Sequence, residues 1–203
     1  MTVIGYSDRI NHAFAFAAKH HDQQVRKGTR LPYLTHPANV AVILTRYGRD
    51  EETVVAGILH DVIEGCVRDG WSVEKLEERI GSKFGNSVLN TTLSVAERRI
   101  DDDGVELSHD DRQSDYLSRL ALANEDALWV SAAHNLHNVN SVLSDLRRTA
   151  FPETVWGRFS AGKEGTVRRY VAFAERLNEI GFRGAIAEEL RNAAGELKTL
   201  SGG

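Results

Sequence analysis

The sequence predicts an all-α fold, and three observations support this prediction. Apolar residues recur every three or four positions along most of the 203-residue chain. Only three prolines interrupt the pattern, and no segment shows the apolar–polar alternation of a β-strand. The length and the 41% hydrophobic content suit one compact core. We therefore expect residues 1–203 to form a single all-helical domain.

The predicted helices follow one another with short breaks. Gly48 stands where a helix would stop, and Ser72 is a plausible N-cap. Three segments interrupt the periodicity and are expected to be loops: residues 23–34, which we call the basic loop, residues 100–111, and residues 149–163. The apolar stripes fall within residues 10–21, 40–47, 55–62, 76–80, 84–95, 129–146, 167–174 and 184–199.

Charge and composition exclude several classes of function. The formal net charge of −4 argues against binding to nucleic acid, because the chain has no overall positive field. No stretch has the uninterrupted apolar length of a signal peptide or a membrane span. Cys66 is the only cysteine, so an intrachain disulfide cannot form. We expect a cytoplasmic protein without a membrane partner, and the pattern leaves the oligomeric state open.

One predicted helix carries ionisable groups where its apolar stripe would not need them. In ILHDVIEGC, residues 58–66, His60 and Asp61 border the stripe, and Glu64 follows one turn later. Gly57 leaves space on the same edge. An imidazole nitrogen and a carboxylate oxygen suit a divalent transition metal. This edge is therefore a candidate metal site.

Further histidines stand at positions from which they could complete such a site. His36 precedes Pro37, which favours the first turn of a helix and should push His36 out of helical conformation. His134 and Asn138 share one face of the long predicted helix. Each histidine alone would more often be a cap or a satisfied core group. Their combination with the adjacent His-Asp pair favours metal binding.

At these residues the chain resembles the HD-domain metal-dependent phosphohydrolases, and among them the small stand-alone Rel/Spo-type hydrolases of guanosine tetra- and pentaphosphate. The resemblance covers about residues 10–180 and rests on FAAKHHDQQVRKGTRLPYLTHPANVAVIL, VVAGILHDVIEG and AAHNLHNV. Its most specific part is H-x-x-Q-x-R-K followed by P-Y-x-x-H-P. It implies an HD-type helical bundle that removes the 3′-pyrophosphate of an alarmone, usually with Mn²⁺, in the stringent response. Because the chain is too short to hold a linked synthetase domain as well, we expect a protein that only hydrolyses.

The resemblance also assigns roles to residues. Glu64 would orient or deprotonate the attacking water. The residues that would contact or support the nucleotide are Arg26, Lys27, Tyr33, Asn138 and Tyr170. The residues that would bind the metal are His36, His60, Asp61 and His134.

Three positions depart from the family pattern. His134 replaces an aspartate, Ser131 replaces a lysine, and Gly65 replaces the second acid after Glu64. Three histidines and one aspartate carry less negative charge than the usual set, which favours Zn²⁺, Fe²⁺ or Co²⁺ over harder ions. Two alternatives therefore stay open: an HD phosphohydrolase for another nucleotide, and a catalytically weak or silent nucleotide-binding protein.

Overall fold

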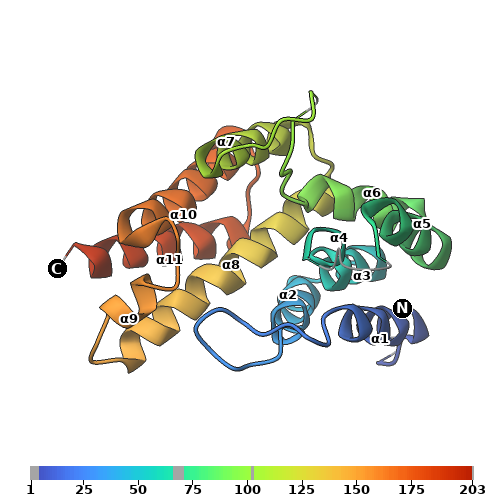
Figure 1. The fold of residues 1–203 in the computed structure, drawn as a ribbon, viewed down its shortest axis with the longest axis horizontal. Coiled ribbons are helices and arrows are strands. Elements are labelled where there is room, and N and C mark those ends of the chain that lie inside the picture. The colour runs from blue at the N-terminus through green and yellow to red at the C-terminus, as the bar shows by residue number, and fades with distance from the viewer. Residues whose placement is uncertain (1–4, 66–70, 102, 203) are drawn as a thin grey trace. The chain divides into compact units, whose positions relative to one another are not determined.

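The computed structural model describes residues 5–65, 71–101 and 103–202, and every regular element in them is a helix (Figure 1). The prediction of an all-α fold is confirmed. Two isolated β-bridges occur, one of them between Val25 and Pro32 in the basic loop. Cys66 lies outside the described residues. The elements are α1 (Asp8–His20), α2 (Thr35–Arg46), α3 (Glu51–Leu59), α4 (Val62–Gly65), α5 (Val73–Phe84), α6 (Asn86–Val95), α7 (His109–Arg119), η1 (Leu120–Leu122), α8 (Glu125–Arg148), α9 (Glu153–Trp156), α10 (Gly162–Glu179) and α11 (Ala185–Ser201).

The chain divides into two compact units. The first unit contains residues 1–26, 30–96 and 124–130, and the second contains residues 27–29, 97–123 and 131–203. Helix α8 begins in the first unit and continues in the second. The basic loop is also divided, because only its tip, residues 27–29, clusters with the second unit.

The core of the first unit is built around α3. This helix contacts α1, α2 and α6, and its residues 53–59 are all buried. Asp50 caps it by accepting hydrogen bonds from the backbone N–H and hydroxyl of Thr53. Gly57 lies so close to Leu44 of α2 that a Cβ atom would overlap the leucine side chain. The glycine therefore permits the close packing of α2 on α3.

Three details of the sequence prediction are wrong. Helix α3 ends at Leu59, so His60 and Asp61 lie in a turn before α4, although His60 keeps right-handed helical dihedrals. His36 lies inside α2, where its N–H donates to the carbonyl oxygen of Tyr33. Pro37 is tolerated there because the first turn of a helix needs few backbone donors. Phe84 ends α5 and does not begin the next helix, since Gly85, at φ 93°, separates α5 from α6.

The second unit packs α10 against α11, and α7 contacts α10 and η1. Helix α7 overlaps the end of residues 100–111, which the sequence predicted to be a loop. Ser108 caps it by accepting from the N–H of Asp111. Its missing apolar stripe explains why the periodicity did not reveal it, since none of its residues is fully buried. No described helix is both long enough and apolar enough to cross a membrane.

Candidate metal centre

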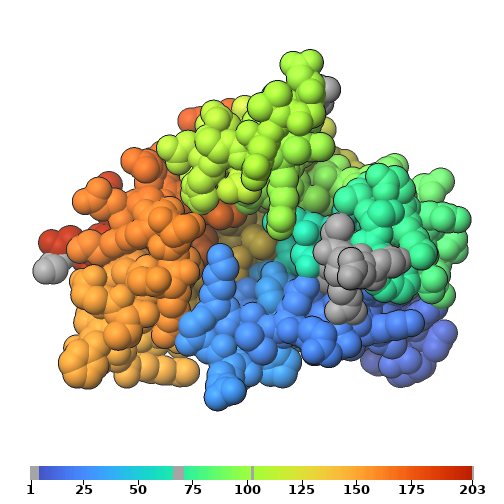
Figure 2. All heavy atoms as spheres, viewed as in Figure 1, coloured from blue at the N-terminus to red at the C-terminus, as the bar shows by residue number. Residues whose placement is uncertain are grey.

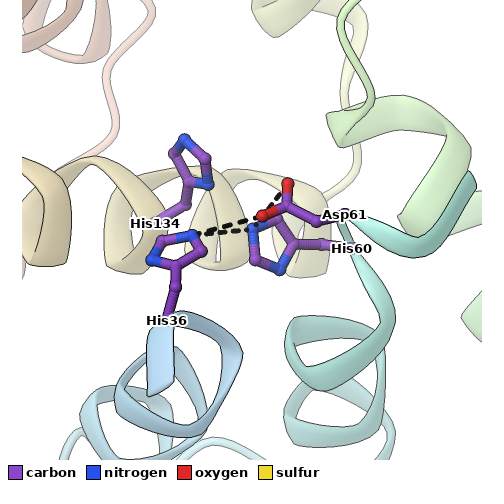
Figure 3. Close-up of side chains that lie close together, drawn as sticks. All are labelled: His36, His60, Asp61 and His134. Atoms are coloured by element: carbon purple, nitrogen blue, oxygen red, sulfur yellow. Dashed lines mark hydrogen bonds and ion pairs between the residues drawn. The ribbon is translucent and has the colours of Figure 1, made fainter. Parts of the chain in front are cut away.

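Three side chains of the first unit converge on one point (Figure 3). The Nε2 atoms of His36 and His60 are 3.2 Å apart. The carboxylate of Asp61 places Oδ1 3.1 Å from Nε2 of His60 and Oδ2 3.5 Å from Nε2 of His36. Both histidines are at most 1% exposed and Asp61 is 7% exposed. Buried ligand atoms that face one another in this way suit a divalent cation that they would share.

The tautomer of His60 also suits metal binding. Its Nδ1 lies 2.7 Å from the carbonyl oxygen of Gly57, which can only accept a hydrogen bond. The proton is therefore assigned to Nδ1, and this leaves the Nε2 lone pair directed toward Asp61 and His36. The end of α3 thus supplies both the backbone that holds the ring and the acceptor that orients it.

Tyr33 of the basic loop orients the carboxylate of Asp61. Its hydroxyl donates a 2.6 Å hydrogen bond to Oδ2 of the carboxylate. Burial raises the pKa of Tyr33 well above its usual range, and the charge and hydrogen bond of Asp61 raise it further. The phenol is therefore a permanent donor near neutral pH. The ring of His21 stacks on Tyr33, with centroids 4.8 Å apart.

The pKa of His60 results from opposing influences. Burial lowers it, but the Asp61 carboxylate and the hydrogen bond to Gly57 outweigh burial and raise it above the ordinary value. The charge of Glu64 adds to this rise. Glu64 also raises the pKa of Tyr33, so its carboxylate lies near enough to affect both groups. It is half-buried in α4, directly after the turn that carries Asp61.

Gln24, to which the sequence analysis assigned no role, holds the end of α4, and His21 contacts Gln24. Gln24 donates from Nε2 to the carbonyl oxygen of Gly65 at 2.5 Å, and its Oε1 lies 2.8 Å from Nδ1 of His21. A Cβ atom on Gly65 would be 3.8 Å from both of these side chains, an ordinary contact. The H-x-x-Q spacing was the only sequence signal for the pair, since i and i+3 residues of a turn lie close together.

Of the predicted nucleotide-binding residues of the basic loop, Arg26 lies beside Tyr33. Arg26 is half-buried and places its guanidinium carbon 5.7 Å from the centroid of the Tyr33 ring. Two backbone hydrogen bonds close the base of the loop, from Arg26 N–H to Leu31 and from Tyr33 N–H to Gln24. Lys27 is exposed at the tip. Figure 2 shows the atoms of this loop, in blue, at the surface.

The remaining predicted residues belong to the second unit. On α8, Nδ2 of Asn138 lies 3.0 Å from Nε2 of His134, and both residues are half-buried. Tyr170 is 7% exposed on the core side of α10, and Ser131 is completely buried. Ser131 therefore supplies neither charge nor reach where the family pattern has a lysine. The sequence prediction that His134 and Asn138 share a helix face agrees with their contact.

Comparisons with known proteins identify the family of the chain. A domain model described as "HD domain" matches residues 13–167. A guanosine-3′,5′-bis(diphosphate) 3′-pyrophosphohydrolase of Aquifex aeolicus is 37% identical over 87 residues, which are 43% of this chain and 12% of that protein. A GTP pyrophosphokinase of Myxococcus xanthus is 30% identical over 138 residues, 66% of this chain and 17% of that protein. The chain thus spans less than a fifth of either relative.

Two solved structures share the fold. The first, described as a metazoan SpoT ortholog that hydrolyses ppGpp, has a TM-score of 0.72 and 22% identity, and the alignment covers 96% of this chain and 98% of that one. The second, a protein of Listeria monocytogenes EGD-e, has a TM-score of 0.64 and 25% identity, with 83% and 99% coverage. Together with the match over residues 13–167, they show that the chain belongs to the HD-domain family.

Proposed function

We propose that the protein is a metal-dependent phosphohydrolase that removes the 3′-pyrophosphate of guanosine tetra- or pentaphosphate. The observation that carries this proposal is the convergence of His36, His60 and Asp61 in the first unit. The activity for which the Aquifex aeolicus relative is named supports the choice of substrate. Hydrolysis of guanosine tetraphosphate would give guanosine 5′-diphosphate and pyrophosphate.

The donor set fits a divalent metal. His60 is already held in the tautomer that ligation needs, and Asp61 contributes the charge that a cation requires. His134 offers a fourth ligand atom and is drawn with the other three in Figure 3. The resemblance favours Mn²⁺, whereas the third imidazole favours Zn²⁺, Fe²⁺ or Co²⁺.

A bound divalent ion would supply an acidified water and polarise a phosphate oxygen. The residues of the chain provide the rest of the chemistry. Glu64 would accept one proton of the water that attacks the 3′-linked phosphorus. The P–O bond to the ribose would then break, with the water oxygen retained on the pyrophosphate, and the 3′ oxygen would take up a proton to become the hydroxyl of the nucleotide. Arg26 and Lys27 would bind the anionic phosphates, and Tyr33 would hold Asp61 in place. Asn138 and Tyr170 are proposed as further nucleotide contacts.

The test is hydrolysis by metal-stripped protein that has been loaded with Mn²⁺, Zn²⁺, Fe²⁺ or Co²⁺. Guanosine tetraphosphate, GTP, GDP and a 2′-phosphorylated dinucleotide would be the substrates, and ion-exchange chromatography would resolve the products. Asp61→Ala should abolish turnover, whereas Asp110→Ala, a change at an exposed carboxylate on α7, should not. If the loaded protein released neither phosphate nor pyrophosphate from any nucleotide, the proposed activity would be refuted.

A second candidate function follows from Gly65. Because this position has no side chain, Glu64 would act without a neighbouring second acid, and the protein could bind nucleotide without turnover. Tight nucleotide binding, no hydrolysis, and no effect of Glu64→Ala on affinity would favour this silent binding protein. Hydrolysis that Glu64→Ala abolishes would exclude it. Rapid hydrolysis of a different nucleotide in the panel would instead change only the substrate.

A further inference from the structure

The tip of the basic loop has a backbone that only glycine adopts readily. Gly28 has φ +70°, in the left-handed region. Lys27 and Gly28 are exposed, whereas Arg26 at the base is half-buried beside Tyr33. The base is closed by backbone hydrogen bonds in the first unit, but residues 27–29 cluster with the second unit. Something in the second unit must therefore contact the tip.

That contact is the side chain of Arg158. Its Cγ, Cδ and Nε atoms lie over the Cα of Gly28 so closely that a Cβ atom there would overlap all three. The aliphatic stem of an arginine commonly packs in this way while its charged end reaches a partner. Arg158 follows α9, whose residues Val155 and Trp156 are buried. Its backbone N–H also donates to the carbonyl oxygen of Val155, so the backbone of Arg158 is held next to α9.

The guanidinium end of Arg158 is held by α8. Nη1 lies 2.5 Å from Oδ2 of Asp145, and the two side chains are 22% and 36% exposed. Asp145 follows Asn138 by seven residues and His134 by eleven, spacings that place all three on one face of a helix. The ion pair therefore connects the tip of the basic loop to the α8 face that carries the proposed ligand and nucleotide contact.

We propose that Arg158, held by Asp145, is a positioning residue that fixes the tip of the basic loop for nucleotide binding. Arg158 need not touch the nucleotide. Its packing on Gly28 limits the motion of Lys27 on one side and of Arg26 on the other. The loop would then hold its cations in place before the phosphates arrive. This inference rests on the proposed function only where it concerns the nucleotide, because the anchoring itself can be measured without a substrate.

The first experiment is limited proteolysis with trypsin, which cleaves after Arg26, Lys27 and Arg30 if the loop is free to enter the protease. Arg158→Met keeps the aliphatic stem but loses the ion pair, and Asp145→Asn removes the pair from its other end. Both variants should be cleaved in the loop roughly three- to fivefold faster, the effect of losing an ion pair of modest strength. Mass spectrometry would identify the cleaved bonds, because Arg158 itself is a tryptic site in the unaltered protein.

Arg147→Met is the matched control. Arg147 also pairs across the second unit, with Glu196 at 2.5 Å, but its side chain is 54% exposed and the pair does not involve the basic loop. The basic loop of Arg147→Met should be cleaved at the same rate as that of the unaltered protein. Gly28→Ala gives a second approach, because the added Cβ must displace Arg158. If circular dichroism showed that Arg158→Met misfolds, Asp145→Asn and Gly28→Ala would still decide whether Arg158 anchors the loop. Loop cleavage at the unaltered rate in these variants would overturn the proposal.

Steady-state kinetics then test the link to the nucleotide. In Arg158→Met, KM for guanosine tetraphosphate should rise about fivefold while kcat stays within about twofold, since binding and not chemistry is affected. Faster loop cleavage with unchanged KM would overturn the role in nucleotide positioning. If the unaltered protein hydrolysed no nucleotide, the proposed function would fail by itself, and the proteolysis result would still decide whether Arg158 anchors the loop.

Discussion

The hydroxyl of Tyr33 should contribute strongly to metal affinity. Its 2.6 Å hydrogen bond to Oδ2 is the contact that orients the Asp61 carboxylate from outside the histidine pair. Tyr33→Phe removes only this hydroxyl, since the ring can keep its stacking on His21 and its contact with Arg26. A hydrogen bond to a charged group contributes about 1.5–3 kcal/mol, which corresponds to roughly 10- to 100-fold in a binding constant. We expect the dissociation constant for Zn²⁺ or Mn²⁺ to rise by that factor.

The assay is competition for the metal with a chromophoric chelator. Because the pKa of Tyr33 is raised, the hydroxyl keeps its proton below its ordinary pKa of about 10. The contribution of the hydrogen bond should therefore be constant near neutral pH and be lost only as pH rises through the folded value. Tyr6→Phe is the control, because Tyr6 donates to exposed Asp8 instead. Equal metal affinity in Tyr33→Phe and the unaltered protein would refute the role assigned to the Tyr33–Asp61 contact.

Three further predictions concern turnover, Gly65 and pH. Glu64→Ala should lower kcat by about 10²- to 10⁴-fold while metal stoichiometry is unchanged, and a similar kcat would show that another group activates the water. Gly65→Asp should change the free energy of unfolding by less than about 1 kcal/mol, because a Cβ there makes ordinary contacts. The same change should raise kcat about tenfold or more. A collapse of the melting temperature would contradict this prediction. In metal-free protein the raised pKa of His60 stabilises the fold below pH about 6.5 and this contribution is lost as pH rises through the folded value. Since ligation needs the neutral ring, the melting-temperature gain on adding Zn²⁺ should grow between about pH 6 and about pH 8, as measured by scanning fluorimetry.

The sequence predicted the fold class because most helices bury one periodic face. The same rule explains where it failed. Helix α7 buries no residue fully, so its only local signals were the N-cap Ser108 and two acidic residues in the first turn. The break between α3 and α4 was hidden because His60 retains helical dihedrals, so the apolar period continues across the turn. Periodicity reports the direction of side chains, and it does not report where one helix ends and the next begins.

The predicted ligands of the first unit, His36, His60 and Asp61, do converge, but the sequence could not show how they are held. Tyr33 and Asp61 are 28 residues apart, and their hydrogen bond depends on the packing of the basic loop against the end of α3. The contact of Gln24 with Gly65 spans 41 residues. Such long-range pairs have no local period or spacing. Gly65 itself was recognised as a departure, but only the structure shows a glutamine and a histidine beside it.

The most direct test of the central claim is a titration of metal into metal-free protein during hydrolysis of guanosine tetraphosphate. If His36, His60, Asp61 and His134 share one ion, the rate of pyrophosphate release should rise linearly to one equivalent of metal and then stay constant. Asp61→Ala should show no such rise, and His134→Ala should need more metal to reach the same rate. Hydrolysis that is independent of added metal, or equal in Asp61→Ala, would contradict the proposed metal centre.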